Sequence, residues 1–348
     1  MQSFNSTHSG RSERTLQLAL FVTSATWFVA SDILAGRSAR GLSERFGLDM
    51  ERPLVAAIFL LFLLAVGFSI LQAIARRHSS LQEVLGLPRR PTSKREWSLG
   101  AAVGWGCVVL AVLPMTLAGK LDVQLWLQPR ALWLVFLNLI TLGIAALAEE
   151  VAFRGYPFRR LVEAIGPVTA TIGMSLLFGL GHALNPGATW TSVFVTMLAG
   201  LLLSIAWLRT HGLWLPWGLH FAWNASIGIL FGLPISGLSE FASVVQTRAF
   251  GPLWLTGGDY GPEGAVFTVI VLLIAVAVLI RITRDYAWDY THRPIVAGGY
   301  AVEVPPPAAH VAMEQEVKPA SAASLVQILP VTPQSRSVGE ERKSYSSD

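Results

Sequence analysis

An uncharged run of eighteen residues, ALWLVFLNLITLGIAALA at positions 131–148, is followed directly by EEVAFRG at 149–155. About 20 apolar residues cross the hydrocarbon core of a bilayer as a helix, so the run predicts a membrane span. Two adjacent carboxylates at the end of a span are unusual, because a charge at bilayer depth costs roughly 2.5–3.5 kcal/mol. The stretch therefore indicates a membrane protein and, at its end, a position of functional interest.

The remaining sequence has the composition of a membrane protein. Of 348 residues, 53% are hydrophobic and 14% are charged, whereas soluble chains contain roughly 25% charged residues. The mean hydropathy is +0.52. Cys107 is the only cysteine, so an intramolecular disulfide and a cysteine metal cluster are both impossible. These values exclude a soluble enzyme, a disulfide scaffold and a fibrous repeat.

Runs without Lys, Arg, Asp or Glu predict the other spans. They cover 53–75, 97–119, 164–208, 210–239 and 264–280. The run 164–208 is too long for one crossing, and Asn185-Pro186-Gly187 supplies a turn, so we divide it into spans near 166–184 and 190–208. Residues 16–36, which contain Asp32, add one more span. The sequence thus predicts an all-α fold, a polytopic membrane helix bundle with about eight transmembrane helices.

The distribution of Lys and Arg predicts the orientation of the chain. With the N-terminus inside, the inner segments hold twelve basic residues before the last span and three just after it, whereas the outer loops hold seven. Cytoplasmic loops carry the excess of basic residues. We therefore predict that both termini are cytoplasmic.

Two further groups of polar residues interrupt apolar runs, FGLGH at 178–182 and HFAWN at 220–224. The i, i+4 spacing places His220 and Asn224 on one face of a helix. Glu149 and Glu150, being adjacent, would point about 100° apart, so one carboxylate can enter a cavity while the other pairs with Arg154.

Each group taken alone has a purely structural explanation. Glu150 and Arg154 would form a helical i, i+4 ion pair at the water interface, and His182, His220 and Asn224 would hydrogen-bond neighbouring helices. Together, these polar groups on three spans would cost more free energy of membrane insertion than helix packing alone requires. They suffice for hydrolysis, because a carboxylate or imidazole can deprotonate water while His or Asn donors stabilise an oxyanion.

The three groups resemble the motif set of the CPBP family, the CAAX proteases and bacteriocin-processing (Abi-type) enzymes of membranes. The family pattern is E-E-x-x-x-R, then F-x-x-x-H, then H-x-x-x-N, and all three motifs occur here in order, from Glu149 to Asn224. The stretch GPLWLTGGDYGPE at 251–263 also resembles the Gly/Pro-rich loop before the last span of bacterial members. The resemblance covers roughly residues 130–282 and implies a protein of the bacterial inner (plasma) membrane.

The resemblance divides the chain into three parts. Residues 1–130 would form N-terminal transmembrane helices with three spans, and 131–282 a CPBP-like catalytic core with five. After about residue 290 the composition shifts to Pro, Ala, Ser and charge. Such a segment cannot bury enough apolar surface to offset its chain entropy, so 283–348 is predicted to be a disordered cytoplasmic tail.

The resemblance also implies a reaction, the hydrolysis of a peptide bond near the membrane, similar to that of type II CAAX prenyl proteases. In this interpretation Glu149 and His182 activate the attacking water. His220 and Asn224 bind the oxyanion of the scissile carbonyl, and Glu150 and Arg154 support the site.

A metal ion is a second possibility for the same residues. Glu149, His182 and His220 offer the mixed nitrogen and oxygen ligands that zinc accepts, and the sequence does not choose between a zinc-dependent and a metal-free glutamate mechanism. The zinc motif His-Glu-x-x-His is absent, since no histidine is followed by glutamate.

The catalytic interpretation requires Glu149 and His182 to lie at the same depth in the membrane. If span four ended at residue 148, Glu149 and His182 would lie roughly 20 Å apart along the membrane normal and could not share a water molecule. Span four must therefore continue to at least Arg154, and span five must be displaced inward.

Partners and competing functions follow from the same features. The expected substrate is a peptide or small membrane protein, prenylated only if the host prenylates proteins, and the lipid bilayer is the surrounding medium. The net charge of +4 is not accompanied by a basic cluster with interleaved aromatics, so no nucleic acid is expected. The alternatives are a non-enzymatic immunity or scaffold protein of the same superfamily, or a transporter, for which the paired broken helices are missing.

Overall fold

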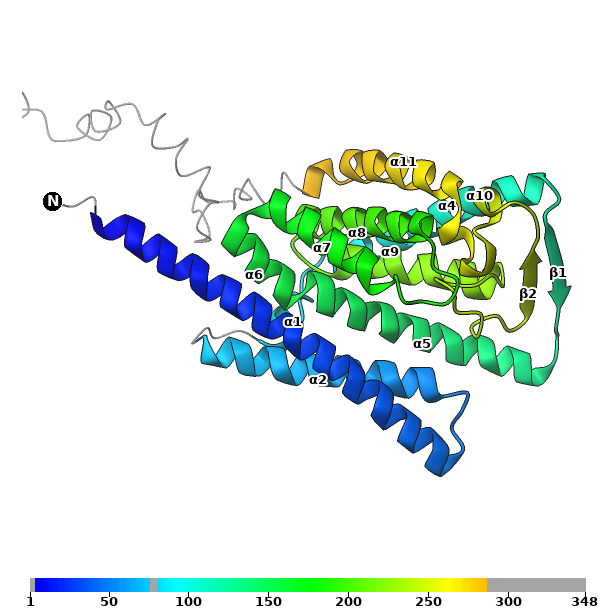
Figure 1. The fold of residues 1–348 in the computed structure, drawn as a ribbon, viewed down its shortest axis with the longest axis horizontal. Helices are drawn as coiled ribbons and strands as arrows, with labels where there is room; N and C mark the ends of the chain where they lie inside the picture. Colours follow the sequence, from blue (N-terminus) through cyan, green and yellow to red (C-terminus); the bar gives the residue numbers. More distant parts are fainter. Residues whose placement is uncertain (1–3, 76–79, 287–348) are drawn as a thin grey trace, which may run out of the picture. The chain divides into compact units, whose positions relative to one another are not determined.

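The computed structural model describes residues 4–75 and 80–286, which belong to one compact unit, Met1–Ala287. The described part is almost entirely helical (Figure 1). The predicted tail lies outside the described residues from residue 287 onward.

Among the described residues, five helices are long and apolar enough to cross a membrane, with α6 continuing the fourth of them to Ile165. They are α1 (Phe4–Phe46), α2 (Arg52–Ile74), α4 (Ser93–Leu117), α5 (Pro129–Arg154) and α8 (Trp190–Thr210). A short α3 (Leu81–Val84) precedes α4. The protein is therefore an integral membrane protein by the length and composition of its helices.

The prediction of eight spans is not confirmed, because the helices at the other three predicted positions are shorter. These are α7 (Pro167–Gly181), α9 (Trp214–Ala225) with a π-helical extension η1 (Ser226–Leu230), and α11 (Val266–Ile282). A ten-residue helix, α6 (Tyr156–Ile165), occupies the chain between α5 and α7. The turn at Asn185-Pro186-Gly187 does separate α7 from α8, as predicted.

A small sheet departs from the all-α prediction. Strand β1 (Leu121–Leu125) pairs antiparallel with β2 (Val245–Ala249), with Leu121 opposite Ala249. The pairing joins two loops at the same end of the helices (Figure 1). It was not predictable from local sequence because its strands lie more than a hundred residues apart and each gains its hydrogen bonds only from the other. The connection to α11 contains α10 (Leu253–Thr256), η2 (Gly258–Tyr260) and η3 (Pro262–Gly264).

The contact between α4 and α9 is the most extensive of the bundle, and glycines make it close. A Cβ atom on Gly100 would overlap the Leu215 carbonyl, and one on Gly104 would overlap the Leu219 carbonyl. Gly218 on α9 similarly faces the Trp97 carbonyl. Small residues at such spacing let membrane helices approach at backbone distance. This contact positions α9, the helix that carries His220.

Candidate active site

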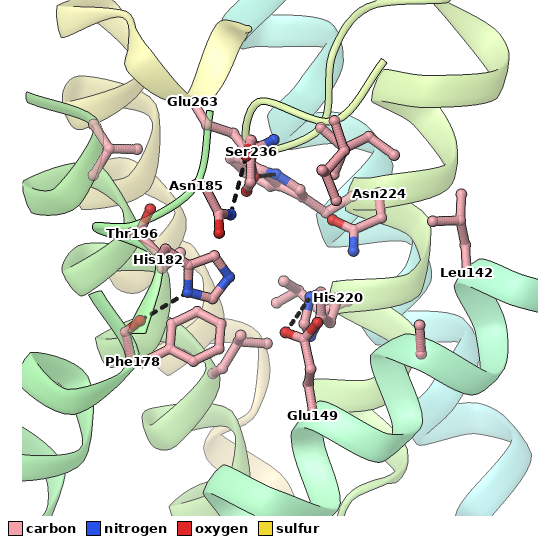
Figure 2. A pocket seen from close by; sticks show the side chains of 18 of the residues that line it. Leu142, Glu149, Phe178, His182, Asn185, Thr196, His220, Asn224, Ser236 and Glu263 are labelled. Carbon is pink, nitrogen blue, oxygen red and sulfur yellow. Dashed lines mark hydrogen bonds and ion pairs between the residues drawn. The ribbon is translucent and has the colours of Figure 1, made fainter. Parts of the chain in front are cut away.

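A cavity of about 150 Å³ lies between α5, α7, α8 and α9, and all three polar motifs contribute to its wall. Glu149 enters from α5, His182 from the end of α7, and His220 and Asn224 from α9 (Figure 2). A cavity of this volume holds several water molecules. The structure therefore brings together four of the six predicted site residues at one surface, while Glu150 and Arg154 lie directly behind it.

The depth requirement of the catalytic interpretation is met. Helix α5 extends beyond the uncharged run that ends at residue 148 and continues to Arg154, as the catalytic interpretation predicted. The Arg154 Nη2 donates a hydrogen bond of 3.2 Å to the carbonyl of Gly200, which lies midway along the membrane-spanning α8. Glu149 precedes Arg154 by roughly 7.5 Å of helix, less than the distance from Gly200 to either end of α8, so it lies within the length of that helix. His182, at the end of α7, lines the same cavity as Glu149.

A buried ion network supports His220. Arg154 and Glu150 are both 0% exposed, and Arg154 Nη1 lies 3.1 Å from Glu150 Oε1. The same Glu150 oxygen is 2.8 Å from Nδ1 of His220. A carboxylate can only accept a hydrogen bond, so His220 donates from Nδ1 to Glu150 and we assign the ring proton to Nδ1. The other ring nitrogen, Nε2, faces away from Glu150. His220 Nε2 lies 3.8 Å from Glu149 Oε2, at the cavity side.

Phe178 packs at the centre of the three motifs. The Arg154 guanidinium lies 4.2 Å from the centroid of its ring, within the range of a cation–π interaction. The rings of Phe153 and His182 lie 5.0 and 4.7 Å from it. Phe178 therefore packs against both the Arg154 guanidinium and the His182 ring and fixes the two side chains relative to each other.

His182 has one ring nitrogen committed and one directed into the cavity (Figure 2). Its Nδ1 is 2.8 Å from the carbonyl oxygen of Phe178. A carbonyl only accepts, so Nδ1 is the protonated nitrogen and Nε2 of the neutral ring holds a free lone pair. The side chain is therefore oriented to accept a proton from a water molecule in the cavity.

Gly179 does not make room for the His182 ring. A Cβ at this position would overlap the side chain of Met197, so Gly179 serves the close contact between α7 and α8. A Cβ at Gly181 would lie 3.9 Å from the ring of Phe153, at ordinary contact distance.

The comparison with protein families agrees with this geometry. Residues 131–226 match the family model described as type II CAAX prenyl endopeptidase Rce1-like. The chain carries an Rce1-like domain. The resemblance to CPBP proteases is thereby confirmed over this segment, which holds all six predicted site residues. Neither the comparison with curated proteins nor that with solved structures finds a match.

The rim of the cavity is formed by residues that sequence reasoning missed, and two of them, Ser236 and Glu263, lie beyond the Rce1-like domain. The buried Glu263 accepts hydrogen bonds from the indole of Trp223 (2.8 Å) and from the hydroxyl and amide of Ser236. Asn185 donates to the Ser236 carbonyl at 3.0 Å. These bonds hold the segment after η1 over the cavity. An acidic residue inside the Gly/Pro-rich loop was the one available signal for Glu263.

Tyr260 supports the same rim from the loop outside the spans. Burial raises the pKa of its phenol, and the nearby Glu263 carboxylate raises it further. The hydroxyl lies 3.4 Å from Thr196 Oγ1, at the cavity wall. The phenol therefore stays neutral and acts as a hydrogen-bonding group at the rim.

The residues suggested as zinc ligands do not form a preformed metal site. Within residues 4–75 and 80–286, no group of three His, Cys, Asp or Glu side chains is arranged to hold a metal ion. The Nδ1 atoms of His182 and His220 are engaged by Phe178 and Glu150, and only the Glu149–His220 pair converges. Zinc needs at least three protein ligands at about 2 Å, which this arrangement does not supply.

Proposed function

We propose that the protein is a metal-free intramembrane endopeptidase, resembling the type II CAAX prenyl proteases, that hydrolyses a peptide bond near the membrane. The observation that carries the proposal is the convergence of Glu149, His182, His220 and Asn224, from three separate helices, on one cavity inside the bundle.

The first step is attack by water on the scissile carbonyl carbon. Glu149 Oε2 is buried at the cavity and has no hydrogen-bond partner within the described residues, so it is placed to accept a proton. His182 presents its free Nε2 to the same space. One of these two groups takes the proton as the new carbon–oxygen bond forms, and the other orients the water.

The second requirement is stabilisation of the negative charge on the carbonyl oxygen. The Asn224 amide lines the cavity one helical turn beyond His220. When His220 carries a proton on Nε2, both residues donate to the oxyanion, and Glu150 offsets the imidazolium charge at Nδ1. Arg154 in turn holds the Glu150 carboxylate in place.

The third step breaks the carbon–nitrogen bond. The proton accepted by Glu149 or His182 passes to the leaving amine nitrogen, and the two products are a carboxylic acid and an amine. No other reactant is needed. The substrate is a leader peptide or small membrane protein, or a prenylated tail if the host prenylates proteins.

The proposal is tested by peptide cleavage with purified protein reconstituted in vesicles. Glu149→Gln and His182→Ala each remove a proton acceptor, so kcat is expected to fall by about 10²–10⁴-fold. Glu240→Gln, an exposed loop variant, serves as the matched control and should retain wild-type activity. Equal activity in all variants would remove the proposed site.

The choice between a metal-free and a zinc mechanism has its own measurement. Cleavage by the wild type is compared before and after dialysis against a chelator, with zinc added back. We expect no change, since the described part of the chain holds no preformed three-ligand site. Loss of activity on chelation that zinc restores would overturn the metal-free mechanism while leaving the peptidase function in place.

A further inference from the structure

A second hollow lies where α4 and α9 begin, and it shares no wall residue with the catalytic cavity. Its volume is about 810 Å³. Three basic and three aromatic side chains dominate its wall: Arg89, Arg90, Lys94, Trp97, Trp214 and Trp217. We call it the tryptophan groove. Because α4 is a membrane-spanning helix and starts at Ser93, the groove lies at the membrane–water boundary.

Two of the three tryptophan rings are held in place by hydrogen bonds from their indole nitrogens. The Trp214 indole donates to the Pro88 carbonyl and the Trp217 indole donates to the Gly143 carbonyl, each at 2.9 Å. Trp97 meets Trp217 edge to face, with ring centroids 6.0 Å apart. With the N–H groups of Trp214 and Trp217 satisfied inside the protein, the groove offers mainly apolar ring surface, which suits a hydrocarbon chain.

The three basic side chains differ in whether they form ion pairs with other residues of the protein. Arg90 pairs with the buried Glu96 at 3.3 Å and forms part of the wall. Arg89 and Lys94 are exposed, and in the part of the chain that the structure describes neither forms an ion pair. The groove therefore carries two available cations at its water edge.

We propose that the tryptophan groove binds an anionic phospholipid, with the phosphate head group at Arg89 and Lys94 and an acyl chain along Trp214 and Trp217. Apolar rings beside available cations match a molecule that is both anionic and acylated. Basic pockets at the ends of membrane helices bind anionic head groups by this complementarity. A zwitterionic lipid would gain the apolar contact without a net charge interaction.

Binding there would act on the helices that carry the catalytic cavity. Trp217 precedes His220 by one turn of α9, and its indole links α9 to Gly143 of α5. A lipid packed on Trp217 would therefore hold α4, α5 and α9 together. The inference does not depend on the proposed peptidase function.

The test is native mass spectrometry of the purified full-length protein in detergent, titrated with phosphatidylglycerol or with phosphatidylcholine of the same chains. The wild type should bind phosphatidylglycerol more tightly. Each cation near an anionic head group contributes about fivefold in affinity, so Arg89→Gln/Lys94→Gln should bind it about 10- to 30-fold more weakly. Arg89→Lys/Lys94→Arg, which keeps both charges, should bind like the wild type.

Two further titrations test whether binding needs the acyl chains as well as the phosphate, and whether it needs the cations of the groove rather than any exposed cations. Arg37→Gln/Arg40→Gln removes two exposed cations from α1 and should leave the affinity unchanged. Glycerol 3-phosphate, a head group without chains, should bind far more weakly than the lipid. Equal binding of the two lipids, undiminished binding by the Arg89→Gln/Lys94→Gln variant, or glycerol 3-phosphate binding as tightly as the lipid would each overturn the proposal.

Discussion

At the scale of single residues, Arg154 shows why the E-E-x-x-x-R motif is costly to disturb. Its guanidinium is 0% exposed and bonds both the buried Glu150 and the Gly200 carbonyl. Removing one partner of a buried ion pair leaves the other charge uncompensated, at a cost of about 3–5 kcal/mol. We therefore expect Arg154→Met to lower the unfolding temperature in detergent strongly.

Arg159 provides the matched control for that measurement. It also pairs with a glutamate four residues on, Glu163 at 3.3 Å, but the two side chains are 49% and 30% exposed. Exposed pairs contribute about 0–1 kcal/mol, so Arg159→Met should unfold close to the wild type. If both arginine variants lost the same stability, the buried network would not be what holds His220.

At the scale of elements, the glycine contact between α4 and α9 determines where His220 and Asn224 lie. Gly104→Leu would push α9 away from α4, because a side chain at Gly104 meets the Leu219 backbone. Overpacking of this kind typically costs about 1–3 kcal/mol. We expect a lower unfolding temperature together with a loss of cleavage activity.

The same helix offers the control for this prediction. A Cβ at Gly106 would meet nothing within 4 Å, so Gly106→Leu adds the same side chain at a position of α4 that does not meet the backbone of α9. Cleavage and thermal unfolding should both stay near wild-type values for Gly106→Leu. Equal damage from the two leucines would point to a change in helix α4 itself rather than in its contact with α9.

At the scale of the whole molecule, the orientation of the chain determines which side of the membrane the cavity rim faces. The distribution of Lys and Arg predicts cytoplasmic termini, which places the loop after η1 outside. Ser239 is exposed in that loop, next to the rim residue Leu238. A cysteine at Ser239 should therefore react with an impermeant maleimide in intact cells.

The comparison for this experiment is Ser344→Cys, near the C-terminus, which should react only after the cells are made permeable. The native Cys107 is buried and provides a low background. Labelling of Ser344→Cys in intact cells, with Ser239→Cys protected, would reverse the orientation. That result would also move the proposed substrate to the other side of the membrane.

Local sequence was sufficient for features that depend on the bilayer or on one helix. Charge-free runs marked α2, α4, α5, α8 and α11, because hydrocarbon excludes charge whatever the tertiary arrangement. The spacing of Glu150 and Arg154 fixed their pairing through helix geometry alone. The motif set led to a family resemblance that the match over residues 131–226 confirms.

Other features required the folded chain. The extension of α5 to Arg154 depends on Gly200 of α8, which supplies a partner for a charge that would otherwise end the span. The rim depends on Glu263, whose three donor groups belong to Trp223 and Ser236, both far from it in sequence. Membrane insertion and helix periodicity were thus encoded locally. The cavity and its depth were decided by tertiary structure, because a buried polar group is stable only where distant segments satisfy it.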